Sequence, residues 1–309
     1  MKIAVMGSGG MGGYLGGRLA QAGRDVTFIA RGQHLQAIRH YGLQVQSPAG
    51  SFVIKPAKAT DDPAEVGPVD LILLCVKSYD VLAATQIMQP MVEAQTAIIP
   101  VQNGIDHIET LSASLEAKHV MGGVGFISAH VASPGIIQHN ESPGILEFGE
   151  LSGGLSARCE TIYQTLAVGG FEVIARPNIA ERMWRKLSGI CGASVFCVTR
   201  GSKRLVWIPE VRELFRQTIS EAVAVARAKA IPLSNSVPDE FVTLLDNHTE
   251  FKPSMLVDLE RNHRLELEVL NGAVSRFGKA LGVPTPVNDF IYACLKPYVN
   301  GLPQPASGR

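Results

Sequence analysis

The stretch that decides the fold is Ile3–Gly13, IAVMGSGGMGG, in which a short apolar segment runs directly into a glycine-rich loop. Its glycines follow the spacing G-x-G-x-x-G, and a helical pattern from Met11 to Ala22 comes next. A loop of this kind between a strand and a helix is typical of dinucleotide binding, because backbone amides and the helix N-terminus face a pyrophosphate. The motif alone also fits a plain glycine-rich turn. Its position near the start of a predicted α/β domain, between a strand and a helix, favours nucleotide binding over such a turn. The predicted cofactor contacts in the loop are Gly7, Ser8, Gly9, Gly10, Met11 and Gly12.

The first third of the chain alternates between short apolar strand patterns and helix patterns, and Val120–Gly149 is then rich in strand patterns and glycine. This alternation predicts βαβ units and a doubly wound, Rossmann-type sheet. The segment DLILLCV (residues 70–76) is apolar after its first residue, as in a parallel strand covered on both faces. Leu43–Gln46 and Phe52–Lys55 flank the turn SPAGS, which predicts a hairpin. The other predicted strands are Ile3–Met6, Val26–Ala30, Thr96–Pro100 and Phe171–Ala175.

The tripeptide RPN, Arg176–Asn178, is the best candidate for a linker, because the pattern after it is almost entirely helical. We therefore expect an α/β fold with two domains. Residues 1–175 would form a Rossmann-type cofactor-binding domain, and residues 176–309 an all-helical domain for substrate binding and dimerisation. The predicted helices of this second part are Ile179–Val198, Val211–Ala230, Pro238–Leu245, Ser254–Phe277 with a possible break, and Val287–Leu295.

The composition excludes several classes of partner. Lys plus Arg and Asp plus Glu number 28 each, so no bulk charge attracts nucleic acid or an anionic membrane. The five cysteines are scattered without a C-x-x-C pair, and the histidines show no metal-ligand spacing, so we expect reduced thiols and no metal site. No apolar run approaches the ~18 residues of a membrane span. We expect a cytoplasmic protein.

Arg31 ends the second predicted strand, VTFIAR. An NAD-dependent enzyme would place an acidic residue near this point to bind the ribose hydroxyls. A guanidinium suits a 2′-phosphate instead, which favours NADPH over NADH, although a solvated surface arginine is the alternative.

Three more polar residues are candidates for a site: two at the carboxyl edge of the predicted sheet, and a third that would face a cleft between the domains if its helix packs there. Lys77 follows the strand DLILLCV, Asn103 follows the next strand, and Lys186 lies on the first helix after the linker. Each alone is more often a solvated charge or a turn residue, and only their joint placement favours a site.

Together, GSGGMGG, Arg31 with RGQHLQAI, VKSYD, QNG, WRKL and KPSMLVDLERNHRLELEVLNG resemble the ketopantoate reductase (2-dehydropantoate 2-reductase) family over nearly the whole chain. The resemblance implies NADPH as cofactor and a helical domain that completes a 2-keto acid site. It also implies that Lys186 is the general acid and that Glu266 positions this lysine and binds the substrate hydroxyl. Asn103 would line the nicotinamide and substrate site, Lys77 would contact cofactor or substrate, and Ser254 would bind the substrate carboxylate.

The spacing of Ser254 and Glu266 tests these roles. Twelve residues span about 18 Å of continuous helix, which is too far for both side chains to touch one small acid. We therefore expect a break near Arg261–Arg264.

The chain departs from the family pattern K-L-x-x-N-x-x-x-N, because Ile190 and Ser194 occupy the asparagine positions. These residues share a helix face with Lys186, so we expect them to line a more apolar pocket, with extra room from Gly189, Gly192 and Ala193. The alternative is that both pack in the core.

Three functions remain open from the sequence. The leading one is NADPH-dependent reduction of a 2-keto acid, with ketopantoate the default substrate and a larger aryl or branched acid a contender. The second is another two-domain dehydrogenase, of the 3-hydroxy acid or opine type. The third is a nucleotide sensor without turnover, which the joint presence of Lys186 and Glu266 disfavours. The only partners expected are the small substrate and, at the family level, a second copy of the chain.

Overall fold

The structure is a computed structural model that describes residues 1–140, 143–201, 205, 207–247 and 251–302. It divides into two compact units. Unit 1 comprises Met1–Gln102 and His107–Ala180, and unit 2 comprises Asn103–Asp106 and Glu181–Arg309. The second limit lies close to the predicted one after residue 175. The assignment of residues 103–106 to unit 2 differs from the prediction.

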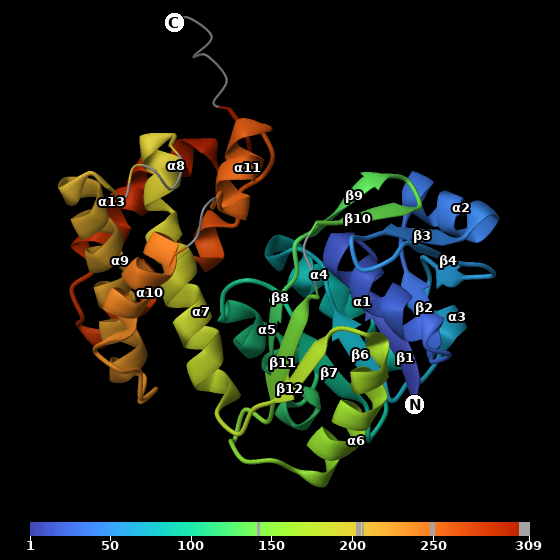
Figure 1. The fold of residues 1–309 in the computed structure, drawn as a ribbon. Helices are drawn as coiled ribbons and strands as arrows, with labels where there is room; N and C mark the ends of the chain where they lie inside the picture. The colour runs from blue at the N-terminus through green and yellow to red at the C-terminus, as the bar shows by residue number, and fades with distance from the viewer. Residues whose placement is uncertain (141–142, 202–204, 206, 248–250, 303–309) are drawn as a thin grey trace, which may run out of the picture. The chain divides into compact units, whose positions relative to one another are not determined.

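The main sheet of unit 1 is parallel and has the strand order β5-β2-β1-β6-β7 (Figure 1). Its central strands are apolar and buried, because helices cover both faces of a parallel sheet. The order reverses between β1 and β6, so the loops after these two strands meet at the carboxyl edge, where open α/β sheets bind ligands. The predicted doubly wound fold is therefore confirmed. The strands are β1 (Lys2–Met6), β2 (Asp25–Ile29), β5 (Lys58–Thr60), β6 (Leu71–Leu74) and β7 (Ala97–Pro100).

Two smaller sheets complete unit 1. One has the order β4-β3-β10-β9 and contains the predicted hairpin, because β3 and β4 pair antiparallel. The other has the order β12-β11-β8. Their strands are β3 (Leu43–Gln46), β4 (Phe52–Ile54), β8 (Gly122–Phe126), β9 (Ala129–Ser133), β10 (Ile136–His139), β11 (Ile145–Gly149) and β12 (Glu172–Ala175). The helices of this part of the chain are α1 (Gly10–Gln21), α2 (Gly32–Tyr41), α3 (Pro63–Val66), α4 (Val81–Ile87), α5 (Asp106–Ser114) and α6 (Ala157–Leu166), with short 3₁₀ turns such as η1 (Ser78–Asp80).

Helix α1 lies between two sheets, and its glycines allow the close packing. A Cβ added at Gly16 would lie 2.7 Å from Phe28 of β2, and one added at Gly13 would lie 2.7 Å from Ile137 of β10. Glycine is a poor helix former, at about 1 kcal/mol per residue relative to alanine. Here the packing of the backbone against both sheets offsets that loss.

Unit 2 is helical in the part of the chain that the structure describes, as predicted. Figure 1 shows α7 as its long yellow helix. Helix α11 ends at Glu260, and Asn262 has a positive φ of 59°, so the predicted break near Arg261–Arg264 is confirmed. The helices are α7 (Ile179–Ala193), α8 (Val195–Thr199), α9 (Pro209–Ala228), α10 (Val237–Asn247), α11 (Ser254–Glu260), α12 (Asn271–Leu281) and α13 (Pro286–Leu295), with the 3₁₀ turn η6 (Leu267–Val269) before α12.

The expectation of extra room beside two α7 glycines is wrong. A Cβ at Gly189 would lie 2.4 Å from the Phe241 ring, and one at Gly192 would lie 2.6 Å from Ile219. The glycines let α9 and α10 approach α7 closely, and large side chains fill the space.

We expect Gly12→Ala to lower the free energy of unfolding by about 2–3 kcal/mol, because overpacking a tight contact forces the backbone to move. The added Cβ would lie 2.2 Å from the Gly7 carbonyl oxygen and 2.9 Å from Val5. Gly9→Ala is the matched control, since its Cβ would meet nothing within 4 Å. Urea unfolding followed by circular dichroism checks both variants, and equal stabilities would contradict the packing role of Gly12.

Candidate functional site

The glycine loop has the geometry of a dinucleotide cradle. Gly7 has a φ of +96°, and a Cβ there would lie 2.8 Å from the backbone nitrogen of Val76, after β6. The Gly7 and Ser8 N–H groups both donate to the Ile29 carbonyl, at 3.3 and 3.1 Å. Gly9 caps α1 without a side-chain hydrogen bond and faces open space. The residues present therefore fit a pyrophosphate, which the amides of the first helical turn would bind.

The loop is also packed from the side of the second sheet. A Cβ at Gly10 would lie 2.2 Å from the Ala129 carbonyl oxygen of β9. Only glycine fits there, so the β9–β10 hairpin fixes the start of α1.

Arg31 and Lys77 both lie at the carboxyl edge of the main sheet. Arg31 precedes α2, its side chain is 84% exposed, and its Nη2 atom lies 3.5 Å from Oδ2 of Asp80. Lys77 is exposed and directly precedes η1. Asp80 could not be predicted as a partner of Arg31, because nothing local in the sequence connects the two positions.

In unit 2 the structure brings Asn103 and Glu266 together. The Asn103 amide donates to Oε2 of Glu266 at 3.2 Å, and the Glu266 residue is only 8% exposed. Gly104 has a φ of +87°, and a Cβ there would lie 2.6 Å from the Val269 carbonyl oxygen. This close approach places the Asn103 side chain beside the segment that carries Glu266.

An ion pair holds the segment Asn103–Asp106 at its second end, Asp106. Arg276 of α12 pairs with the Asp106 carboxylate and donates to the Glu268 carbonyl at 2.9 Å. On Glu268, burial is outweighed by hydrogen bonds from Lys296 and Tyr292, which hold the pKa of this carboxyl below its usual value. Sequence reasoning missed this anchor, since its partners are far apart in the chain.

The other predicted site residues of unit 2 differ in their surroundings. Lys186 lies in the middle of α7 and is partly buried, and Ile190 follows one turn later. Ser254 is exposed at the first residue of α11. Ser194 lies just beyond the end of α7, is 1% exposed, and donates its hydroxyl to the Ile190 carbonyl at 3.3 Å. These features of Ser194 favour the core-packing alternative over a substrate contact.

Three of the cysteines are poor nucleophiles. Burial raises the pKa of Cys75 and of Cys197 to about 12, and burial also raises that of Cys191. Within the described ranges, no group of three or more His, Cys, Asp or Glu side chains is placed to hold a metal ion. No helix in that part of the chain is long and apolar enough to cross a membrane.

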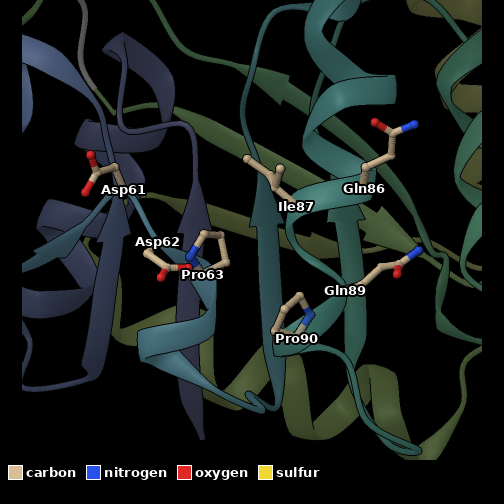
Figure 2. Close-up of a pocket in the computed structure, with 7 residues that line it drawn as sticks. All are labelled: Asp61, Asp62, Pro63, Gln86, Ile87, Gln89 and Pro90. Atoms are coloured by element: carbon tan, nitrogen blue, oxygen red, sulfur yellow. The ribbon is translucent and has the colours of Figure 1, made fainter.

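A groove in unit 1 is lined by none of the predicted site residues. Figure 2 shows its lining residues, which come from the loop after β5 and from the end of α4 and the turn after it. The volume of the groove is about 440 Å³. Two carboxylates line it, but Asp61 pairs with Arg39 at 3.9 Å and Asp62 accepts the Ala64 N–H of α3 at 2.9 Å. The lining residues are Asp61, Asp62, Pro63, Gln86, Ile87, Gln89 and Pro90.

Comparison with known proteins extends over both units. The family profile "Ketopantoate reductase PanE/ApbA" matches residues 3–153, and "Ketopantoate reductase PanE/ApbA C terminal" matches residues 178–299. The crystal structure of a PanE/ApbA family ketopantoate reductase from Ralstonia eutropha JMP134 is similar, with 31% identity, a TM-score of 0.88, and coverage of 97% of this chain and 99% of that one. The "uncharacterized oxidoreductase YkpB" of Bacillus subtilis is 29% identical over 96% of this chain and 99% of its own length.

A further similar structure is a D-mandelate dehydrogenase in complex with NADH and anilino(oxo)acetate. It is 26% identical, with a TM-score of 0.88, over 97% of this chain and 98% of that one. The fold and these matches define an oxidoreductase that acts on a CH–OH group and uses a nicotinamide cofactor. The chain belongs to the ketopantoate reductase family.

We expect Asn103→Asp to destabilise unit 2 at pH 8, because it places a second carboxylate against the buried Glu266. The like charge raises the pKa of the introduced carboxyl, so part of the loss should be recovered at pH 5, where a larger fraction of that carboxyl is protonated than at pH 8. Asn103→Ala, which only removes a donor, should lose about 1–3 kcal/mol at both pH values. Thermal unfolding at the two pH values checks this, and a pH-independent loss in Asn103→Asp would contradict it.

Proposed function

We propose that the chain reduces a 2-keto acid to the 2-hydroxy acid with NADPH, and that 2-dehydropantoate (ketopantoate), which gives pantoate, is its first candidate substrate. The observation that carries the proposal is the hydrogen bond from Asn103 to the buried Glu266, in the same unit as Lys186. Reduction of a carbonyl requires a hydride donor and a proton donor, and an ammonium positioned by a carboxylate can supply the proton.

Lys186 is proposed as the general acid. Reduction with a bound nicotinamide would bring a hydride to the carbonyl carbon, so negative charge would develop on the carbonyl oxygen. An ammonium next to this oxygen stabilises the charge and donates the proton that completes the alcohol.

Glu266 is proposed to orient Lys186 and to accept a hydrogen bond from the substrate. The Asn103 amide holds Oε2 of Glu266 at 3.2 Å, which restricts rotation of the carboxylate. Ser254, exposed at the start of α11, is the proposed partner of the substrate carboxylate.

Arg31 is proposed to bind the 2′-phosphate of NADPH, and Lys77 to add positive charge at the same edge. Exposed ion pairs such as Arg31–Asp80 contribute only about 0–1 kcal/mol. A phosphate carries more charge than a carboxylate and can therefore displace Asp80 from the guanidinium.

A larger or more apolar 2-keto acid is the second candidate substrate. Ile190, partly buried one turn after Lys186, supplies an apolar surface where the family pattern has an amide. The similar D-mandelate dehydrogenase binds anilino(oxo)acetate, a 2-oxo acid with an aryl group. A panel of branched and aryl 2-keto acids tested beside ketopantoate distinguishes the two candidates.

We expect Lys186→Ala to lower kcat by about 10²-fold or more, since this is the usual contribution of a general acid. The KM for NADPH should change little. Lys279→Ala, at an exposed position of α12, is the matched control and should keep full activity. NADPH oxidation followed at 340 nm across the panel measures both, and wild-type activity in Lys186→Ala would remove the proposed acid.

We expect Arg31→Asp to abolish the preference for NADPH. The introduced carboxylate repels the 2′-phosphate, so kcat/KM should fall by about 10–100-fold for NADPH and not for NADH. Steady-state kinetics with both cofactors at low ionic strength test this, and unchanged ratios would refute the role of Arg31.

A further inference from the structure

His34 of α2 connects the glycine loop to the β9–β10 turn through both ring nitrogens. The Gly135 N–H donates to Nδ1 of His34 at 3.0 Å, and Nε2 lies 2.8 Å from the Ser8 carbonyl oxygen. A backbone N–H can only donate, so Nδ1 is the acceptor and the neutral ring carries its proton on Nε2. His34 therefore donates to the Ser8 carbonyl.

This bond determines which way the Ser8–Gly9 peptide points. The rest of Ser8 is fixed on β2, because its N–H and its hydroxyl both donate to the Ile29 carbonyl. In a trans peptide the carbonyl of one residue and the N–H of the next point in opposite directions. With the Ser8 carbonyl held towards α2, the Gly9 N–H points away from α2.

Gly9 makes this peptide easy to turn over. A peptide that precedes glycine can flip at low cost, because glycine accepts positive φ values. In the structure Gly9 has a φ of −70°, and its α-carbon faces open space. A flip would replace an N–H donor by a carbonyl oxygen in the loop that binds an anion.

We propose that His34 is a positioning residue for the cofactor: by holding the Ser8 carbonyl, it keeps the Gly9 N–H directed at the pyrophosphate of the dinucleotide. The inference rests on the proposed cofactor binding by this loop and adds a residue outside the glycine motif. His34 acts through the peptide and does not touch the nucleotide.

Three variants separate this role from simple support of the fold. His34→Gln can place an amide N–H near the position of Nε2 and so keep the bond to Ser8. His34→Asn can keep an acceptor near Nδ1 for the Gly135 N–H but cannot reach Ser8. His34→Ala removes both bonds. His40→Ala, at an exposed position of the same helix, is the matched control.

We expect the Kd for NADPH, measured by fluorescence titration, to rise about tenfold in His34→Ala and His34→Asn. This is the effect of losing the one charge-assisted hydrogen bond from the Gly9 N–H to the pyrophosphate. His34→Gln should return to within threefold of the wild type, and His40→Ala should equal it. The kcat at saturating NADPH should stay within twofold throughout. Adenosine 2′-monophosphate, which lacks the pyrophosphate, should bind all variants equally when it competes with NADPH.

The inference is overturned if His34→Ala binds NADPH like the wild type, if His34→Asn recovers affinity as well as His34→Gln does, or if affinity for adenosine 2′-monophosphate falls in the same proportion. If the wild type prefers NADH, the same titrations apply, because both dinucleotides carry the pyrophosphate. Failure of the proposed cofactor binding would show in the wild type, which would then bind neither dinucleotide. Failure of the role of His34 would show only between variants.

Discussion

The close approach of α1 to β1 is the constraint on which unit 1 depends. A Cβ at Gly12 would lie 2.2 Å from the Gly7 carbonyl oxygen and 2.9 Å from Val5 of β1, so the helix backbone lies directly against the strand that precedes it and against the loop between them. The same helix packs on a second sheet through Gly13. Because side chains are absent at these contacts, the helix axis and the amides at its N-terminus occupy a fixed position at the carboxyl edge of the sheet. The loop can therefore bind an anion with little rearrangement, because its amides are already in position.

A different principle governs unit 2, where a buried carboxylate needs partners. Glu266 is 8% exposed, and leaving such a group without a donor would be expensive in free energy. Asn103 supplies one donor from a segment that Arg276 holds through Asp106. The chemistry proposed for this unit thus depends on a hydrogen bond between residues 163 positions apart in the chain.

Local patterns in the sequence were sufficient for the sheet, the glycine loop and the break after α11, because glycine spacing, apolar runs and helix length act over short distances. They were insufficient where a residue's environment depends on distant partners. His34 looks like an ordinary residue of a short surface helix, yet its ring joins Ser8 to Gly135. Ser194 matches the helix face of Lys186 by spacing, but α7 ends one residue earlier and the side chain is buried. The filled space beside Gly189 likewise depends on Phe241, some 50 residues later.

The segment Asn103–Asp106 gives the helical unit a discontinuous boundary. Recombination between members of the family that exchanged only residues 181–309 would leave the incoming Glu266 and Arg276 positions facing a foreign tetrapeptide. The two parts must therefore change together for the unit to keep its own contacts. The helical unit is thus not encoded by a single stretch of the gene. Among members of the family, we expect substitutions at positions 103–106 to occur together with substitutions in the helical unit more often than with substitutions in the sheet that precedes them.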